Sequence, residues 1–177
     1  LVDRTKRPHL MVSGASGSYK TRSSIRTAVA CNLTQGWNVT VIGKAVDFFP
    51  FEDHPNFSIL SVDVRKHAQK YLDLLRSLTA KMDERDQLLA SKRISTWDRY
   101  GAPQDLIVLD DFSGFMLRMT NTSRVEVLDE LKQIAMDGRK FGLNLLIGIQ
   151  RPSASSIDTD LRSLLARISF RVETAKE

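Results

Sequence analysis

The stretch LMVSGASGSYKT, residues 10–21, decides the fold. Its first four residues predict a buried strand, and a helix is predicted over residues 20–34, ending near Gly36. Between them, the run from Gly14 to Thr21 matches the phosphate-binding loop G-x-x-x-x-G-K-[ST], except that Tyr19 replaces the second glycine. In such a loop, backbone N–H groups and the N-terminus of the helix contact phosphate.

The residues of this loop have expected roles at a bound nucleotide. Lys20 is predicted to reach the β- and γ-phosphates, and Thr21 is predicted to coordinate Mg²⁺. The ring of Tyr19 must turn away from the nucleotide, because a bulky side chain restricts a backbone that approaches its ligand closely. The predicted ATP contacts are Gly14, Ala15, Ser16, Gly17, Ser18, Tyr19, Lys20, Thr21 and Arg22.

A second motif follows the unbroken apolar run 106–109, which predicts a central strand covered by helices on both faces. Asp110 and Asp111 stand at its carboxyl end, the edge at which ligands bind in open parallel sheets. Asp110 is predicted to hold Mg²⁺, and Asp111 is predicted to polarise the attacking water. Residues 143–149 predict another buried strand, and Gln150 follows it. The Gln150 amide is predicted either to reach the same edge or to be an ordinary turn residue.

The rest of the chain alternates between short apolar runs and amphipathic stretches. This pattern predicts one α/β domain over residues 1–177, with a mainly parallel central sheet and helices on both faces. Asp63 is predicted to cap a long helix, and Ser123 is predicted to open the next one with a capping box. Further strands are predicted at 38–43, 57–60 and 168–172, and an exposed loop at 45–57. The long helix is predicted to turn a basic face outward, either merely solvated or touching DNA: Arg65, Lys66, Lys70, Arg76, Lys81 and Arg85.

Composition narrows the class of partner. The chain has 177 residues, a net charge of +5 and a pI near 9.5, a balance that favours polyanions. A run of about 20 apolar residues, as a membrane-spanning helix needs, does not occur, and the expected location is the cytoplasm. Because the sequence lacks a starting Met, it is expected to be cut from a longer protein, for which a membrane anchor stays open. The single cysteine, Cys31, is predicted to be a small core residue, and no zinc site is expected.

Several segments together resemble the motor domain of the FtsK/SpoIIIE family of DNA translocases. Residues 7–14, RPHLMVSG, are similar to the family's MPHLLVAG approach to the phosphate loop, and Lys44 stands like the lysine of its DPK motif. Residues 82–85 and 97–100 resemble its MERRY helix and the segment that follows. Residues 146–153, LIGIQRPS, resemble its ATQRPS signature, and residues 167–172, RISFRV, its RIAFRV strand. The resemblance covers nearly the whole chain.

The resemblance implies a RecA-like P-loop ATPase that uses ATP and Mg²⁺ and assembles into a ring, usually of six subunits, around double-stranded DNA. It implies that Arg139 reaches the nucleotide of an adjacent subunit, although an ordinary surface arginine stays the alternative. It also implies that Arg151 and Arg162 face the DNA. Asp111 stands where the family usually has Glu, and together with Tyr19 this departure leaves a weakened ATPase open.

Three functions therefore remain open at this point. The first is ATP-driven translocation of double-stranded DNA, in chromosome or plasmid partition, conjugative transfer or phage DNA handling. The second is an ATPase domain of a protein secretion system, a class that often carries degenerate phosphate loops. The third is a degenerate nucleotide-binding scaffold. The segment QRPS, residues 150–153, and the positive charge favour DNA translocation.

Overall fold

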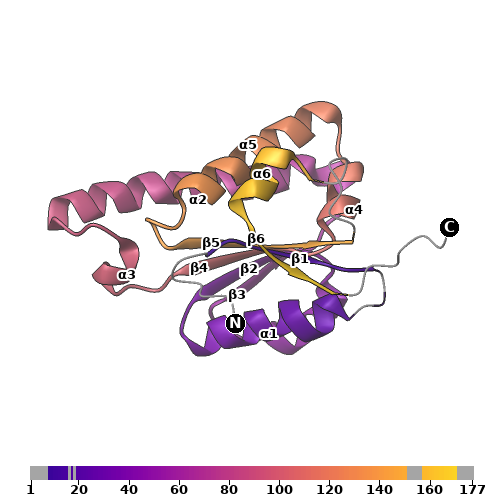
Figure 1. Cartoon of the computed structure of the whole chain (residues 1–177), viewed down its shortest axis with the longest axis horizontal. Helices are drawn as coiled ribbons and strands as arrows, with labels where there is room; N and C mark the ends of the chain where they lie inside the picture. The colour runs from indigo at the N-terminus through magenta and orange to yellow at the C-terminus, as the bar shows by residue number, and fades with distance from the viewer. Residues whose placement is uncertain (1–7, 16, 18, 151–156, 171–177) are drawn as a thin grey trace.

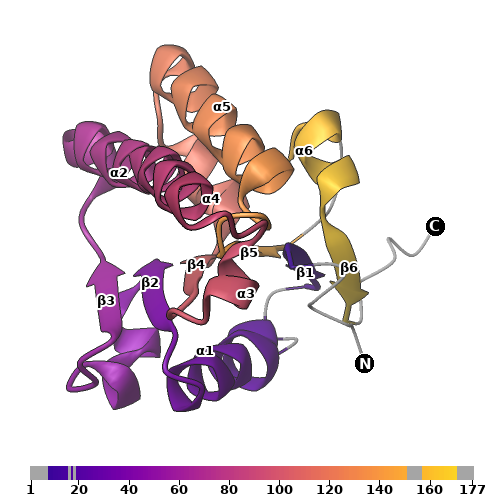
Figure 2. The same ribbon diagram turned by 90° about the vertical axis from the view of Figure 1, so that its left-hand side faces the viewer.

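The computed structural model describes residues 8–15, 17, 19–150 and 157–170. Within these residues, six parallel strands form one sheet in the order β3-β2-β4-β5-β1-β6 (Figures 1 and 2). The expected parallel α/β fold is confirmed. The strands are β1 (Leu10–Ser13), β2 (Asn38–Ile42), β3 (Phe57–Leu60), β4 (Asp105–Leu109), β5 (Leu143–Ile149) and β6 (Ala166–Ser169).

Helices cover both faces of the sheet, as Figure 1 shows. One face is covered by α1 (Arg26–Thr34), and the other by α2 (Val64–Lys92), α4 (Phe112–Leu117), α5 (Asn121–Asp137) and α6 (Thr159–Leu164). A π-helical turn, η1 (Lys20–Ile25), precedes α1, and two short 3₁₀ turns, η2 (Ala45–Asp47) and η3 (Phe49–Phe51), lie in the predicted loop. The short α3 (Trp97–Tyr100) lies beyond one end of the strands. In the part of the chain that the structure describes, no helix combines the length and the apolar character needed to span a membrane.

The apolar run of β4 is unbroken because both faces of this strand are buried. Leu106 and Val108 pack in the cluster on the α1 face, with Ile25 and Val29. Ile107 and Leu109 pack in the larger cluster beneath α2 and α5. Alternate residues of a strand point to opposite faces, so a central strand between two helical layers needs apolar residues at every position.

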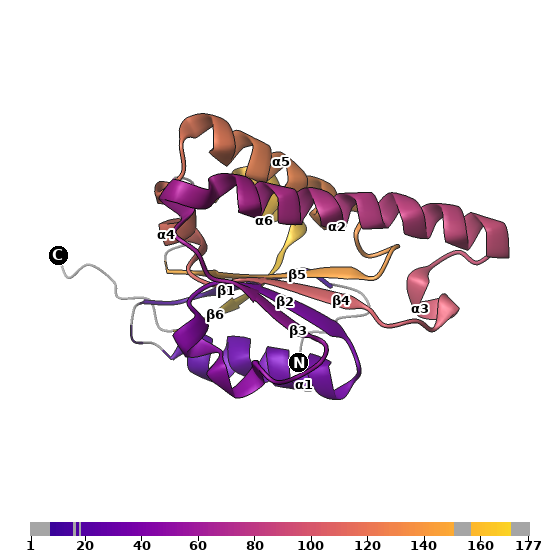
Figure 3. The ribbon, with the colours of Figure 1, turned by 180° about the vertical axis from the view of Figure 1, so that it is seen from behind.

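The 29-residue α2 runs along the sheet, with α4 near one end and α3 near the other (Figure 3). As predicted, Asp63 caps it by accepting a hydrogen bond from the Arg65 backbone N–H at 3.1 Å. His67 has non-helical backbone angles (φ −132°, ψ 32°), which marks a kink in the first turns. The expectation that Arg85 points outward is wrong: its side chain is buried and forms an ion pair with Asp105.

Three further expectations are corrected by the structure. The cap of α5 is Thr120, whose hydroxyl accepts from the Ser123 backbone N–H at 3.3 Å, so the helix begins before the predicted capping box. Cys31 is exposed, because Val29 and Leu33 occupy the face of α1 that packs on the sheet and Cys31 lies between them on the other side. The last strand begins at Ala166 rather than at residue 168, because Ala166 pairs with Leu10 at the start of β1.

Candidate nucleotide site

The predicted phosphate loop joins β1 to a helix, as its motif requires. Gly14 continues the sheet by donating its N–H to the Ile149 carbonyl at 3.2 Å, and Gly17 has a positive φ of 78°. The helix predicted over residues 20–34 is divided in two: residues 20–25 form a π-helical turn and α1 follows. Such wider turns occur preferentially at functional sites. Lys20 lies at the first position of this turn, with its Nζ 3.5 Å from the Ala15 carbonyl oxygen.

Tyr19 adopts the left-handed conformation that a glycine would adopt more easily. Its φ is 60°, and its carbonyl accepts hydrogen bonds from both the N–H and the Oγ of Ser23, each at 2.8 Å. The left-handed conformation costs a residue with a Cβ about 1–2 kcal/mol. The Tyr19 side chain is 69% exposed, so the ring lies at the mouth of the site rather than against the core.

The two predicted motifs meet at the carboxyl end of β4. The Thr21 hydroxyl donates to the Asp110 carboxylate, with Oγ1 at 3.1 Å from Oδ1 and 3.2 Å from Oδ2. Two glycines on the neighbouring strands make room for this carboxylate. A Cβ at Gly43 would lie 3.2 Å from the Asp110 Cβ, and a Cβ at Gly148 would lie 3.1 Å from its Oδ1. The contact between Thr21 and Asp110 therefore depends on the residues that flank β4 as well as on the motifs.

The environment of Asp110 disfavours the ionised form of its carboxyl group. Burial raises the pKa of the Asp110 carboxyl, and the nearby carboxylates of Asp47 and Asp111 raise it further, while the hydrogen bond from Thr21 lowers it. The net pKa lies above the ordinary aspartate value. A buried carboxylate next to other carboxylates is stabilised by a bound cation.

We expect Asp110→Asn to raise the stability of the chain at pH 7 in the absence of nucleotide and Mg²⁺. Because the folded state raises the pKa of Asp110, the folded protein binds the proton more tightly than the unfolded chain does. The Asp110 carboxyl therefore stabilises the fold at pH values below its pKa in the unfolded chain. That stabilisation is lost as the pH rises through its pKa in the folded protein. The asparagine amide cannot ionise. When the free energy of unfolding is measured in urea from pH 3.5 to 7.5, that of the variant should therefore rise relative to that of the wild type as the pH rises.

The control for this prediction is Asp158→Asn, which should show the opposite trend. Burial raises the pKa of Asp158, but backbone N–H groups of Leu161 and Asp160 and the Lys132 ammonium outweigh burial and hold the pKa below its ordinary value. Asp158 therefore stabilises the fold above its unfolded pKa, and that stability is lost as the pH falls. Equal pH trends for the two variants would contradict the environment assigned to Asp110.

Asp111 lies directly beyond Asp110 and turns into the next helix. It has a left-handed backbone (φ 55°, ψ 47°) at the N-cap of α4, and its carboxylate packs against Gly114, where a Cβ would collide with it. The Gln150 Nε2 donates to the Asp111 Oδ1 at 3.3 Å. The Gln150 amide thus reaches Asp111 from the end of β5, the first of its two predicted placements, and its part in hydrolysis stays a prediction.

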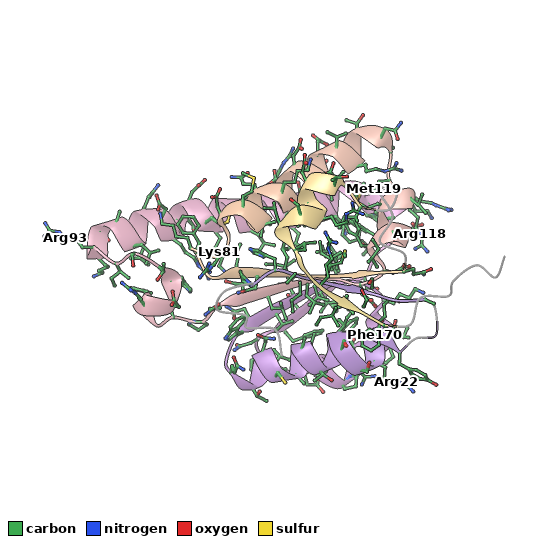
Figure 4. All side chains as sticks on the ribbon, in the orientation of Figure 1. Arg22, Lys81, Arg93, Arg118, Met119 and Phe170 are labelled. Carbon is green, nitrogen blue, oxygen red and sulfur yellow. The ribbon has the colours of Figure 1, made fainter. Side chains whose placement is uncertain are left out.

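These residues line one cleft of about 670 Å³ along the carboxyl ends of the strands. Beyond the two motifs, the cleft extends to the ends of β2 and β3, where Tyr71 lies. Burial raises the pKa of Tyr71, and its hydroxyl donates to the Val62 carbonyl at 2.5 Å. Figure 4 shows Arg22 and Arg118 at this end of the molecule. The charged residues that line the cleft are Lys20, Arg22, Lys44, Asp47, Asp63, Asp110, Asp111 and Arg118.

Sequence reasoning missed Arg118 and Asp47, because neither belongs to a motif at a strand end. Other predicted residues do not join the cleft. Arg139 is exposed in the turn before β5, at the opposite edge of the sheet, where it lines a second cavity of about 840 Å³. Arg162 lies partly buried on α6. Ser16, Ser18 and Arg151 lie outside the described residues.

No protein-family model matches the chain, but individual proteins do. It is 28% identical over 189 residues to the DNA translocase FtsK of Helicobacter pylori, covering 98% of this chain and 21% of that protein. It is also 28% identical over 172 residues to the Ftsk domain-containing protein YdcQ of Bacillus subtilis, covering 94% of this chain and 34% of that protein. The chain thus spans between a fifth and about a third of the length of these relatives.

Solved structures support the fold. The structure of the pCW3 conjugation coupling protein TcpA with ATPγS matches this chain with a TM-score of 0.82 at 22% identity. The match covers 95% of this chain and 50% of the TcpA chain. The second and third ATPases of EssC from Geobacillus thermodenitrificans match 98% of this chain and 34% of their own with a TM-score of 0.76 at 18% identity. The resemblance indicated by the motifs is thereby confirmed: over nearly its whole length this sequence resembles the DNA translocases FtsK, and the chain has the RecA-like P-loop fold.

Proposed function

We propose that this chain binds and hydrolyses ATP and uses the energy to move double-stranded DNA. The observation that carries the proposal is the contact between Thr21 and Asp110, which joins the phosphate loop to the acidic pair in one cleft. Several sequence relatives are named DNA translocase FtsK, which supports DNA as the molecule that ATP hydrolysis would move. The positive net charge of +5 agrees with a phosphate-rich partner.

The residues of the cleft suit each part of phosphoryl transfer to water. The loop N–H groups and the Lys20 ammonium would bind the phosphates. The Thr21 hydroxyl and the Asp110 carboxylate offer the oxygen ligands that Mg²⁺ prefers, and the raised pKa of Asp110 indicates a carboxylate that a cation would stabilise. Bound Mg²⁺ would neutralise charge on the phosphates. Asp111 would accept a proton from the attacking water, and Gln150, hydrogen bonded to it, would orient that water.

DNA binding and assembly extend the proposal beyond the single chain. Arg151 and Arg162 are proposed to contact the DNA backbone, which would make binding largely indifferent to sequence. Several copies would form a ring, for which we propose six subunits, with Arg139 of each chain completing the cleft of its neighbour. The proposed location is the cytoplasm, where ATP and DNA meet.

The test is ATP hydrolysis with and without double-stranded DNA, with Lys20→Ala as the background. Turnover that rises with DNA length and concentration and is lost in Lys20→Ala would support the motor. DNA displacement, measured by removal of a triplex-forming strand, would then separate translocation from simple DNA-stimulated hydrolysis. Nucleotide binding without any turnover would instead favour the scaffold reading.

A protein secretion ATPase is the second candidate, and two observations favour it. The first is Tyr19, which makes the phosphate loop degenerate. The second is the fold, which matches EssC and also the Type VII Secretion ATPase EccC of Thermomonospora curvata; the match to EccC has a TM-score of 0.72 at 23% identity. A different EccC structure contains a signal sequence peptide. Turnover that responds to such peptides and is indifferent to DNA would overturn the DNA reading.

Tyr19→Gly is expected to bind ATP more tightly and to hydrolyse it faster than the wild type. Glycine adopts the left-handed conformation without the cost of about 1–2 kcal/mol that a Cβ adds, and it lets the backbone approach the phosphates. Isothermal titration with ATP and steady-state kinetics would measure both effects. Tyr19→Ala keeps the Cβ and removes the ring, so it should recover less affinity than glycine. A glycine variant that binds ATP more weakly would show that the ring itself contacts the nucleotide.

A further inference from the structure

The turn that carries Arg139 is held by an unusual set of hydrogen bonds. It joins α5 to β5, and three consecutive carbonyl groups directly after Arg139 each accept from a different donor. Lys140 accepts from the Trp97 backbone N–H at 2.9 Å, Phe141 from Arg85 Nη1 at 2.6 Å, and Gly142 from the Asp105 backbone N–H at 2.9 Å. Arg139 itself is exposed. The backbone directly after Arg139 is therefore held by hydrogen bonds, while Arg139 stays accessible to solvent.

Two side chains donate to these carbonyls: Arg85 to Phe141, and Asn144 Nδ2 to Gly142 at 3.3 Å. Arg85 is the charged one of the two, and it is almost wholly buried, with 5% of its surface exposed. Its Nη2 pairs with the Asp105 carboxylate, and its Cζ lies 4.0 Å from the centre of the Trp97 ring. The planar guanidinium thus makes contacts in three directions at once, which a lysine cannot do. One arginine ties α2, α3, the start of β4 and the Arg139 turn together.

Lys81 provides a matched comparison one turn earlier on α2. Its Nζ lies 2.7 Å from the other oxygen of the same Asp105 carboxylate, and Figure 4 shows it at the sheet end opposite Arg22 and Arg118. Lys81 therefore balances the charge of Asp105, but it does not donate to the turn in the contacts of the described residues. The charge of Asp105 alone does not require Arg85 to be where it is.

We propose that Arg85 is a positioning residue that holds Arg139 in place for catalysis in the neighbouring subunit. The inference rests on the proposed function, in which Arg139 completes an adjacent cleft. An arginine that stabilises a transition state across an interface must be held within a fraction of an ångström of its position. A turn held at three successive carbonyls supplies that rigidity, and Arg85 is the charged side chain that links it to α2.

The first test is trypsin cleavage after Arg139 and Lys140 in Arg85→Met, at a temperature at which the chain is folded. Methionine keeps the length of the side chain, and Lys81 remains to pair with Asp105. Cleavage in the turn should become about tenfold faster or more, as loss of a hydrogen bond from a charged donor implies. Cleavage after the exposed Arg118, at the other sheet edge, should not change, and neither should any site in Lys81→Met. An unchanged rate of cleavage in the turn, or an equal acceleration of cleavage after Arg118, would overturn the proposal.

The second test separates positioning from general damage by mixing chains in the presence of DNA. A Lys20→Ala chain cannot hydrolyse ATP but carries an intact Arg139. When this chain is added to Arg139→Ala chains, ATP turnover should be restored, because it supplies the missing arginine to their clefts. The turnover of Arg85→Met chains should be restored in the same way. Arg85→Met alone should lose kcat about tenfold or more with little change in KM.

The outcomes of the mixing test are distinguishable. Restoration of Arg139→Ala but not of Arg85→Met would overturn the inference and leave the proposed function standing. Full activity of Arg139→Ala alone would remove its proposed role, and the inference with it. A wild-type chain without turnover would contradict the proposed function itself, and the trypsin test would still decide whether Arg85 holds the turn.

Discussion

Asp111→Asn is expected to lower kcat for ATP hydrolysis by about 10²–10⁴-fold, the range associated with a positioned general base. The amide keeps the size of the side chain but cannot accept the proton of the attacking water. Asparagine tolerates the left-handed backbone that residue 111 adopts, so the turn into α4 should be retained. Its side-chain oxygen can still accept the hydrogen bond from Gln150.

The variant should still bind nucleotide, because Lys20, Thr21 and Asp110 are unchanged. Binding of a fluorescent ATP analogue therefore serves as the internal control for folding, beside steady-state turnover with DNA. Asp111→Glu is the matched variant, since it restores the longer acid of the FtsK/SpoIIIE pattern, and it should retain or exceed wild-type turnover if the base only needs reach. A kcat for Asp111→Asn within threefold of the wild type would show that another group activates the water.

The nucleotide site could be predicted from the sequence because its determinants are local. The loop from Gly14 to Thr21 and the pair Asp110-Asp111 each follow an apolar strand, and parallel strands bring their carboxyl ends to one edge. That rule places the two motifs in the same cleft, where Thr21 and Asp110 lie within hydrogen-bond distance at 3.1 Å. The strand over residues 143–149 has the bounds that the sequence predicts, since a buried parallel strand is nearly continuous in apolar residues, with Asn144 as the polar exception here.

Arg85 shows where such prediction stops. Its spacing from Met82 and Leu89 places it on the buried face of α2, but its charge led to the expectation of an exposed position. The deciding partner is Asp105, twenty residues along the chain at the start of another element. A single sequence contains no signal for such a long-range pair, whereas a Ramachandran or capping preference is set by neighbouring residues. The role of the Arg139 turn is hidden for the same reason.

Asp105→Ala is expected to destabilise the fold by about 3–5 kcal/mol, the cost of removing one partner of a buried ion pair. The Asp105 carboxylate accepts from Arg85, from Lys81 Nζ at 2.7 Å and from Asn38 Nδ2 at 3.4 Å, and both Arg85 and Asp105 are buried. Without it, the Arg85 guanidinium stays buried beside Trp97 with its charge uncompensated. The free energy of unfolding in urea, with the m-value checked for two-state behaviour, measures the loss.

Asp86→Ala is the control, since it removes an ion pair from the same helix. Asp86 pairs with Lys140 at 2.9 Å, but both side chains are 54% exposed, so the change should cost less than about 1 kcal/mol. A similarly small loss in Asp105→Ala would show that water reaches the pair and that Arg85 does not anchor the turn.

The double variant Arg85→Met with Asp105→Leu decides why the pair is there. Replacing both charges of a buried pair with apolar groups is often neutral for stability or favourable. We therefore expect the double variant to recover most of the stability that Asp105→Ala loses, while trypsin still cleaves quickly after Arg139. Stability and a fixed turn would then be separated in one protein, because an apolar core can replace the charges but cannot donate a hydrogen bond to the Phe141 carbonyl.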